Sequence, residues 1–371
     1  MRVQQNIRIV IAGGGTGGHL FPAISIAHAL KNINPHVDIL FVGALGRMEM
    51  EKVPAAGFKI MGLPIEGFNR KNLLKNIPVV LKLLKSLWIS RTILKQFKPH
   101  AAIGVGGYAS GPILWIASQQ GIPIYIQEQN SYAGITNRIL AQKAKKIFVA
   151  YAGMDKFFPA DRIVLSGNPI RKGLDNLQDL RHEAIRHFHL SPDKKTILCL
   201  GGSLGARSIN QAILHHLPWL YEQHNVQLLW QCGKIYFEQI KSSVKEGQNV
   251  VLRDFIAEMH LAYAAADVII SRAGAGTISE LCVVGKPTIL VPSPNVSEDH
   301  QTKNAMSLVQ SGAAIMISDN EAKERLLPEA VKLLSDEALC NRLSENIKKL
   351  ALPEAAHNIA IAILNDINNI K

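Results

Sequence analysis

Twice along the chain, a short apolar segment runs directly into a glycine-rich loop. Residues 7–12 lead into the loop 13–18, and residues 196–200 lead into the loop 201–205 about 190 positions later. A buried strand followed by a glycine loop and a helix is how a Rossmann-like unit begins. We therefore expect an α/β protein with two doubly wound domains, each built on a mainly parallel sheet.

Further apolar runs alternate with helical patterns in both halves of the chain. Continuous Ile, Val and Leu are typical of strands that are buried on both faces of a parallel sheet. The expected strands are residues 7–12, 38–42, 101–105, 122–126, 146–149, 163–165, 196–200, 227–231, 250–252, 267–270 and 288–291. Helices are expected at residues 22–30, with Pro22 in the first turn, and at 208–217 and 355–367.

The boundary between the two domains is expected where Gly167, Asn168 and Pro169 interrupt the pattern. We predict an N-terminal domain of residues 1–168 and a C-terminal domain of residues 169–353. The last helix, within residues 354–371, can pack back on the first domain.

The positive charge of the chain is concentrated in its first half. The net charge is +12, yet residues 1–170 carry 20 basic and 7 acidic side chains, whereas residues 171–371 carry 21 and 22. Such a basic half-chain indicates an anionic partner, which could be a nucleic acid, a membrane surface or an acidic substrate. With 47% hydrophobic and 19% charged residues, a disordered or collagen-like chain is excluded.

The cysteines and the apolar runs indicate a cytoplasmic location. Cys199, Cys232, Cys282 and Cys340 form no CxxC unit, and Cys199 and Cys282 lie in apolar runs, as reduced buried thiols do. The first apolar run is too short for a signal peptide, and the sequence contains no stretch of 18 uncharged apolar residues. We expect no transmembrane helix.

A third glycine loop, residues 105–112, also follows an expected strand. Loop amides and helix N-termini attract anions, so three loops favour a phosphorylated ligand, although glycines in any one loop could simply make a tight turn. No loop matches the P-loop pattern GxxxxGK[ST]. NAD binding is disfavoured because Asp38 stands at the start of its strand instead of ending it. No cofactor is expected.

Seven motifs in order resemble those of the MurG family, the UDP-N-acetylglucosamine transferases that convert lipid I to lipid II in peptidoglycan synthesis. They are residues 14–19 (GGTGGH), 106–112 (GGYASGP), 127–130 (QEQN), 167–171 (GNPIR), 201–207 (GGSLGAR), 271–280 (SRAGAGTISE) and 299–305 (DHQTKNA). The resemblance implies a GT-B fold with a cleft between its domains. It also implies a peripheral enzyme at the cytoplasmic face of the inner membrane. The N-terminal domain would face the acceptor and the membrane, and the C-terminal domain would bind UDP-GlcNAc. One departure is Leu204, where the family usually has glutamine.

The resemblance also implies which residues hold the UDP-GlcNAc donor. Ala275, Gly276 and Thr277 begin a helix whose N–H groups suit a diphosphate, and Glu280 could accept both ribose hydroxyls. The donor-binding residues would be Thr16, Gly17, Gly18, Asn130, Arg171, Ser203, Ile256, Ala275, Gly276, Thr277, Ile278, Ser279, Glu280 and Gln301. Among them, Arg171 and Ser203 would meet phosphate, Ile256 would contact uracil through its backbone, and Gln301 would read sugar hydroxyls. A solvated helical glutamate and an exposed glutamine are the alternatives for Glu280 and Gln301.

A general base must remove a proton from the acceptor hydroxyl during attack at the anomeric carbon. His19 follows the first glycine loop at a helix N-terminus, which favours the neutral imidazole that can accept a proton. Glu128 is the second candidate, or it orients the acceptor together with Asn130. Gly106, Gly107 and Tyr108 are expected to bind the acceptor, lipid I. Direct attack would invert the anomer from α to β; a purely structural His19 is the alternative.

Metal binding is not expected, because no D-x-D sequence occurs among the twelve aspartates. The charge of the leaving diphosphate would instead be balanced by the helix dipole, by loop amides and by Arg171.

Residues 67–100 combine eight cations with many apolar residues and contain no aspartate or glutamate. On a helix, Lys82 and Lys85 share one side, while Leu81, Leu84, Leu87 and Trp88 fall on another. Basic and apolar residues together suit anionic lipid headgroups, and Lys82, Lys85, Trp88 and Arg91 are the expected membrane contacts. An ordinary solvated helix is the alternative, and nucleic acid is disfavoured because aromatic residues are sparse.

Two other classes of protein stay open at this point. One is a GT-B enzyme similar to the UDP-GlcNAc 2-epimerases, which needs several catalytic carboxylates. The other is a non-catalytic protein that binds anionic surfaces.

Overall fold

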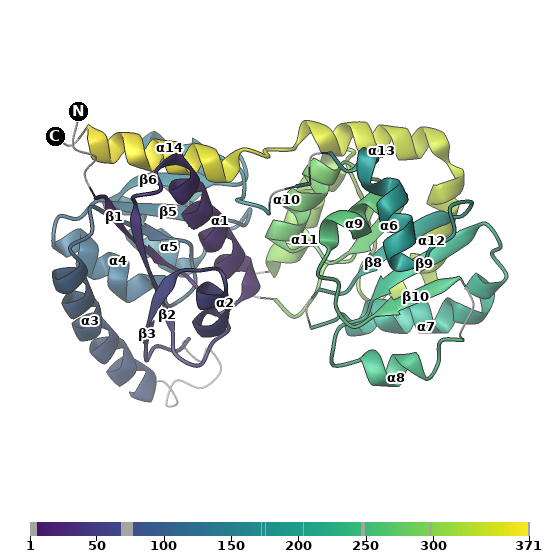
Figure 1. The fold of residues 1–371 in the computed structure, drawn as a ribbon, viewed down its shortest axis with the longest axis horizontal. Helices are drawn as coiled ribbons and strands as arrows, with labels where there is room; N and C mark the ends of the chain where they lie inside the picture. Colours follow the sequence, from purple (N-terminus) through teal and green to yellow (C-terminus); the bar gives the residue numbers. More distant parts are fainter. Residues whose placement is uncertain are drawn as a thin grey trace. The chain divides into compact units, whose positions relative to one another are not determined.

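The computed structural model describes residues 6–67, 77–171, 173–174, 176–202, 204–245, 249–296 and 299–369. The chain forms two compact units (Figure 1). The first comprises Met1–Ile170 and Leu352–Lys371, and the second comprises Arg171–Ala351. The divisions expected from the sequence lie after residues 168 and 353, within two residues of these.

The first unit is built on a seven-stranded parallel sheet in the order β3-β2-β1-β4-β5-β6-β7. The order reverses between β1 and β4, and at such a switch point loops diverge to leave room for a ligand. The strands are β1 (Arg8–Ala12), β2 (Asp38–Ala44), β3 (Lys59–Leu63), β4 (Ala101–Gly104), β5 (Ile124–Glu128), β6 (Ala144–Val149) and β7 (Ile163–Leu165).

Helices cover both faces of this sheet. On one face, α1 lies beside α14, and Leu20, Ile26 and Leu30 pack with Ile359 and Ile363 (Figure 1). On the other face, α3 lies against α4, and α4 lies against α5. The helices are α1 (Gly17–Ile33), α2 (Glu49–Ala55), α3 (Ile77–Phe97), α4 (Ser110–Gln119), α5 (Ile135–Leu140) and α14 (Ala355–Asn368).

The second unit repeats this plan around a six-stranded parallel sheet in the order β10-β9-β8-β11-β12-β13. Its strands are β8 (Lys195–Leu200), β9 (Val226–Gln231), β10 (Val250–Arg253), β11 (Val268–Ser271), β12 (Thr288–Leu290) and β13 (Ile315–Met316). Its helices are α6 (Arg181–Phe188), α7 (Arg207–Tyr221), α8 (Phe237–Lys241), α9 (Met259–Ala265), α10 (Ala275–Val284), α11 (His300–Gln310), α12 (Ala322–Ser335) and α13 (Glu337–Lys349).

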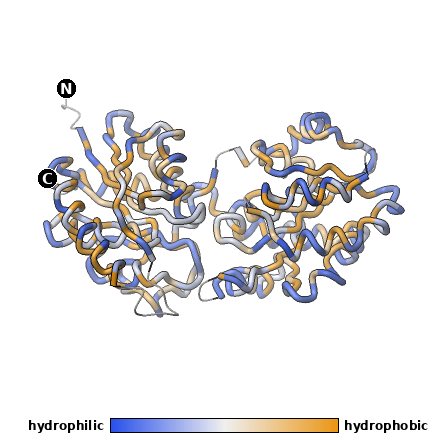
Figure 2. Tube along the Cα trace, turned by 90° about the horizontal axis from the view of Figure 1, so that it is seen from below, coloured by the Kyte–Doolittle hydropathy of each residue, from blue (hydrophilic) through white to orange (hydrophobic). Residues whose placement is uncertain are grey.

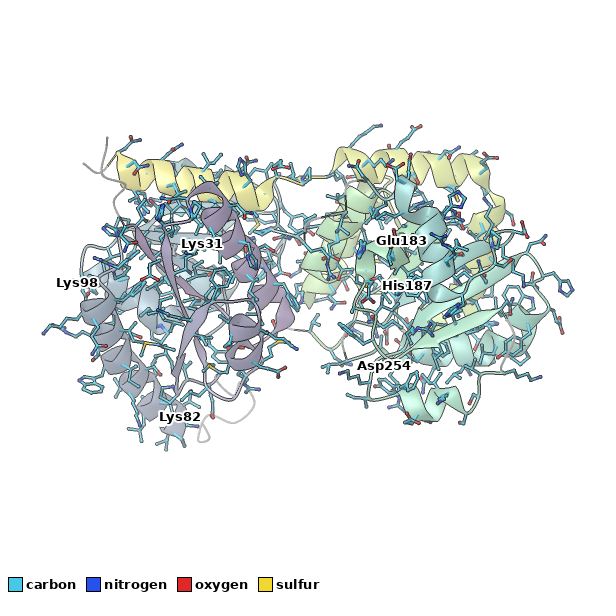
Figure 3. The ribbon with its side chains drawn as sticks, in the orientation of Figure 1. Lys31, Lys82, Lys98, Glu183, His187 and Asp254 are labelled. Atoms are coloured by element: carbon cyan, nitrogen blue, oxygen red, sulfur yellow. The ribbon has the colours of Figure 1, made fainter. Side chains whose placement is uncertain are left out.

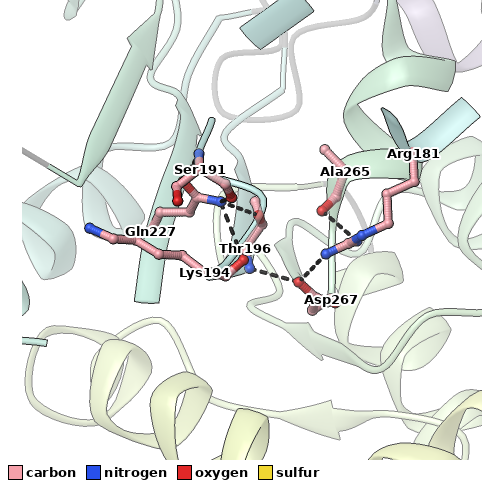
Figure 4. Close-up of polar contacts among 7 residues, drawn as sticks. All are labelled: Arg181, Ser191, Lys194, Thr196, Gln227, Ala265 and Asp267. Carbon is pink, nitrogen blue, oxygen red and sulfur yellow. Dashed lines mark hydrogen bonds and ion pairs between the residues drawn. The ribbon is translucent and has the colours of Figure 1, made fainter. Parts of the chain in front are cut away.

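Polar side chains join the amino ends of β8, β9 and β11 in the second unit (Figure 4). Asp267 accepts hydrogen bonds from the Thr196 backbone N–H at 2.7 Å and from the Arg181 guanidinium at 3.0 Å. Gln227 donates to the backbone carbonyl of Ser191 at 2.8 Å. Because ligands bind at the carboxyl ends of strands in such sheets, this network belongs to the framework of the unit.

The hydropathy of the chain follows the layers, with hydrophobic residues concentrated in the strands and inner helix turns of each unit (Figure 2). The doubly wound fold and every expected strand are confirmed, whereas β3 and β13 were not anticipated. Pro22 was placed in the wrong turn: α1 already begins at Gly17, because the last two loop glycines are helical. All four cysteines are free thiols. No helix in the described ranges is long and apolar enough to cross a membrane.

Candidate active site

The first glycine loop holds a carboxylate of the protein itself. The Gly15 N–H donates to both carboxylate oxygens of Glu49 at 3.1 Å, and the Ala44 N–H donates to Oε1 at 3.0 Å. Glu49 is fully buried, and a Cβ on Gly14 would lie 2.2 Å from its Oε1. The Gly15 amide is thus already paired with a side chain of the protein itself, and only the other amides of this loop are left for a ligand. Sequence reasoning missed Glu49.

His19 and the expected acceptor residues come together at the carboxyl ends of β1 and β4. His19 is the third residue of α1, and its Nδ1 lies 3.1 Å from Oε1 of Gln129. Gly107 has a φ of +77°, and a Cβ there would lie 2.4 Å from the Gly14 carbonyl and 3.1 Å from the imidazole. Only glycine therefore lets the second loop approach His19 so closely. Tyr108 packs beside Gly15.

Glu128, the second candidate base, lies at the end of β5 and is only 2% exposed. Its carboxylate accepts hydrogen bonds from the backbone N–H groups of Asn130 at 3.1 Å and Gly134 at 2.9 Å, and from Asn137 Nδ2 at 2.9 Å. Burial raises the pKa of Glu128, and these hydrogen bonds oppose the rise. The contacts shape the turn that leads into α5, which is sufficient reason for a carboxylate at this position.

The anion site expected in the second unit would lie at the start of α10. Gly274 caps the helix, and Ala275, Gly276 and Thr277 form its first turn at the carboxyl end of β11. The first backbone N–H groups of a helix have no intrahelical acceptor. A Cβ on Gly276 would meet no atom within 4 Å, so space is open there. Ile278 and Ser279 hold the turn itself, because the Ile278 N–H donates to Gly274 at 2.9 Å and the Ser279 hydroxyl donates to Ala275 at 3.1 Å.

Glu280 extends from α10 toward two partners in its own unit. Its Oε1 accepts a hydrogen bond from Nε of Arg171 at 2.7 Å, and its Oε2 accepts one from the Tyr263 hydroxyl at 3.0 Å. Burial, and then the charge of Glu280, raise the pKa of Tyr263, so the phenol keeps its proton and donates. Two expected donor residues, Arg171 and Glu280, are therefore adjacent, and sequence reasoning missed Tyr263.

Two further residues expected to bind UDP-GlcNAc, Ile256 and Gln301, make hydrogen bonds that support loops. The Ile256 N–H donates to Oε1 of Gln231 at 2.9 Å, and Gln231 donates to the Gly202 carbonyl at 3.1 Å. Because the Ile256 N–H is used by Gln231, the expected backbone contact to uracil would have to come from the Ile256 carbonyl. Gln301 accepts a hydrogen bond from the Ser293 N–H at 2.9 Å.

The remaining donor candidates belong to the loops of the two units. In the first unit, Thr16 caps α1, Gly17 and Gly18 begin it, and Asn130 lies in the turn after Glu128. In the second unit, Ser203 lies outside the described residues, and the neighbouring Leu204 is exposed.

An exposed face of the first unit combines apolar and basic side chains. On α3, Leu81, Leu84 and Trp88 are exposed, Trp88 by 70%, and Lys85 and Arg91 are exposed beside them. Lys82 lies on the same helix (Figure 3). Its Nζ lies 2.5 Å from Oε1 of Glu66, one residue before the acid-free segment.

The neighbouring helices α4 and α5 also carry exposed apolar and basic side chains. On α4, Trp115 carries the ammonium of Lys143 at 5.0 Å from its ring centre. On α5, Ile135, Arg138 and Ile139 line a hollow of about 440 Å³ with Phe157. Sequence reasoning missed these residues of α4 and α5.

Comparison with known proteins identifies the family of this chain. Residues 9–149 match the glycosyltransferase family 28 N-terminal domain, and residues 196–359 match the glycosyltransferase family 28 C-terminal domain. The chain is 56% identical, over 96% of its length and 95% of the relative, to the UDP-N-acetylglucosamine–N-acetylmuramyl-(pentapeptide) pyrophosphoryl-undecaprenol N-acetylglucosamine transferase of Bacteroides fragilis. It is 54% identical to the transferase of the same name from Bacteroides thetaiotaomicron, over 98% of both chains. The chain belongs to the MurG family.

A solved structure agrees with this membership. The crystal structure of Acinetobacter baumannii MurG superimposes with a TM-score of 0.77 at 28% identity, over 97% of this chain and 99% of that one. The GT-B fold and the glycosyltransferase class expected from the motifs are confirmed. Membership in the MurG family also decides against the epimerase-like and non-catalytic alternatives. Within the described ranges, no group of three or more His, Cys, Asp or Glu side chains could hold a metal ion.

Proposed function

We propose that this protein transfers N-acetylglucosamine from UDP-GlcNAc to the C4 hydroxyl of N-acetylmuramic acid in lipid I, which yields lipid II for peptidoglycan synthesis. The observation that carries the proposal is the 56% identity, over nearly the whole chain, to a transferase with that donor and acceptor in its name. The clustering of His19, Gly106 and Gly107 supports it independently, because a base beside a close-packed glycine loop suits an incoming sugar hydroxyl.

His19 acts as the general base in this proposal. Its position in the first turn of α1 favours the neutral imidazole, since the positive end of the helix dipole opposes a second positive charge. As the acceptor oxygen forms its bond to the anomeric carbon, His19 takes the hydroxyl proton, and the bond from that carbon to UDP breaks. A single displacement inverts the anomer from α to β. Glu128 is the weaker candidate, since its carboxylate is buried and already accepts hydrogen bonds from the 130–137 turn.

The second unit supplies the donor contacts. The N–H groups at the start of α10 and the charge of Arg171 balance the diphosphate, and Glu280 accepts the ribose hydroxyls. Tyr263 holds Glu280 in place through its hydroxyl. Because the sequence lacks a D-x-D pair, we infer that these groups balance the charge of the leaving UDP without a metal ion.

The apolar and basic face of α3, α4 and α5 binds the anionic headgroups of the inner membrane at its cytoplasmic side. Exposed Leu84 and Trp88 can enter the interface between headgroups and acyl chains, while Lys85 and Arg91 meet lipid phosphates. This face and the candidate base belong to the same unit, so the unit that binds the membrane also receives the membrane-bound acceptor.

Release of UDP tests this function. The protein should release UDP from UDP-GlcNAc only when a lipid I analogue is present, and His19→Gln should slow that release by about 10²–10⁴-fold, the usual contribution of a general base. Release of UDP at the same rate without acceptor would contradict the proposal.

A further inference from the structure

Three buried side-chain amides form a chain of hydrogen bonds that ends at His19. Gln127 lies in β5, Gln129 follows that strand, and Asn168 follows β7, all within the first unit. Their exposed fractions are 0%, 1% and 2%. Buried amides must find partners for both their oxygen and their nitrogen. Their partners therefore reveal which way each amide points.

Backbone carbonyls set the orientation of the Gln129 amide. Its Nε2 lies 2.8 Å from the carbonyl oxygen of Val105 and 3.2 Å from that of Gln127. Carbonyl oxygens only accept, so the NH₂ group must face them and Oε1 must face His19. That oxygen lies 3.1 Å from His19 Nδ1 and also only accepts. The proton between them therefore belongs to Nδ1.

The other two amides prevent Gln129 from turning over. Asn168 donates through Nδ2 to the carbonyl oxygen of Gln129 at 3.0 Å, and its Oδ1 accepts from Gln127 Nε2 at 3.0 Å. Gln127 in turn presents Oε1 to the NH₂ group of Gln129. Reversing any one amide would bring two donors or two acceptors together. Backbone carbonyls at both ends thus set the direction of the whole series of hydrogen bonds.

We propose that Gln129 is a positioning residue that holds neutral His19 as the Nδ1–H tautomer, which places the lone pair on Nε2. The catalytic meaning of this tautomer rests on the proposed function, in which His19 removes the acceptor proton. Gly106 and Gly107 leave room for the imidazole at this position, because a Cβ on either would lie 3.1–3.3 Å from ring atoms. Gln127 and Asn168 act one step further away, by holding Gln129.

Nitrogen NMR of the protein labelled with ¹⁵N in its 13 histidines tests the tautomer directly. The His19 signals are assigned as those that disappear in His19→Gln. We expect Nδ1 to resonate as a protonated nitrogen and Nε2 as an unprotonated one, at a pH where the ring is neutral. An unprotonated Nδ1 in the wild-type protein would overturn the proposal, whatever the behaviour of any variant.

A variant of Gln129 tests the cause. Gln129→Met removes the acceptor at similar volume and should mix the two tautomers of His19. With substrates, Gln129→Met should lower kcat by about tenfold or more and leave the KM for UDP-GlcNAc within about twofold. Gln119→Met on the exposed end of α4 is the matched control and should change neither quantity. An unchanged tautomer in Gln129→Met would overturn the assigned role.

The two readouts separate this inference from the proposed function. If the tautomer behaves as expected but lipid I is not glycosylated, the function fails and the role of Gln129 stands. If lipid I is glycosylated while His19 carries its proton on Nε2, the function stands and the positioning role fails.

Discussion

Arg171 and Glu280, two residues expected to hold different parts of the donor, pair with each other at 2.7 Å in the second unit. The Arg171 side chain is 47% exposed and that of Glu280 is 13% exposed, so a ligand reaches the guanidinium more easily than the carboxylate. Arg171 keeps N–H groups beyond the Nε that Glu280 uses. One arginine can therefore hold the carboxylate that is expected to bind ribose and still have N–H groups for a phosphate.

Arg171→Ala should weaken the binding of UDP without unfolding the protein. Loss of a charge-assisted hydrogen bond should cost about 1.5–3 kcal/mol of binding free energy. The melting temperature should change little, because the side chain is half-exposed. Calorimetric titration with UDP measures the effect, and Arg186→Ala on the exposed face of α6 is the matched control. Equal UDP affinity in the two variants would remove Arg171 from the donor site.

The buried carboxyl group of Glu128 should make stability depend on pH in a defined direction. Burial raises its pKa above the ordinary value of about 4.5, so the folded state binds this proton more tightly than the unfolded state does. As pH rises from that ordinary value toward the raised one, the folded state should lose stability relative to Glu128→Gln, which does not titrate. Urea unfolding of both proteins across pH 4–8 measures the difference.

The control for this pH series is Glu238→Gln, at an exposed glutamate of α8. Its unfolding free energy should follow that of the wild-type protein at every pH. A wild-type advantage over Glu128→Gln that grows with rising pH would show that the hydrogen bonds from the 130–137 turn outweigh burial.

Changing Lys82, Lys85 and Arg91 to glutamine should markedly reduce binding to anionic vesicles. Each cation near an anionic surface contributes about 1 kcal/mol, and Lys82 should contribute less than the other two because Glu66 pairs with it. Added salt should weaken wild-type binding in the same way by screening. Co-sedimentation with anionic and with neutral vesicles measures the loss.

A second triple variant with Lys234, Lys241 and Lys245 changed to glutamine removes the same charge from the second unit and serves as the control. It should sediment like the wild-type protein. UDP affinity should be unchanged in the α3 variant, because most of the expected donor residues belong to the second unit. Equal sedimentation of the two triple variants would mean that α3 is only a solvated helix.

Full activity is expected in the presence of EDTA. The prediction follows from the absence of a D-x-D pair in the sequence and from the N–H groups and guanidinium that can balance the diphosphate. UDP release is measured before and after chelation and dialysis. Activity that falls in chelator and returns with magnesium or manganese would show that a metal ion takes part.

Most of the fold could be predicted from the sequence because central parallel strands are continuously apolar. Two edge strands were missed because they lack this continuous apolar pattern. The strand β3 reads KIMGL with its first residues partly exposed, and β13 has only two residues, so neither has the signature of a buried strand.

The candidate site was predicted only where residues stand in recognisable motifs, as His19, Gly106 and Glu280 do. Glu49 and Tyr263 escaped notice, and Gln129 was noted only as part of the 127–130 motif. The partners of these three residues lie 34, 17 and 110 positions away along the chain. Nothing in the local pattern shows that Glu49 fills the first glycine loop. The sequence likewise cannot show that a glutamine after β5 faces a histidine of α1.

The most direct test of the proposed function is identification of the product made from UDP-GlcNAc and a lipid I analogue. Mass spectrometry should show the analogue enlarged by one N-acetylhexosamine, and proton NMR should show that sugar in β linkage to C4 of N-acetylmuramic acid. An unmodified analogue, an α linkage, or epimerised UDP-sugar in place of a disaccharide would contradict it.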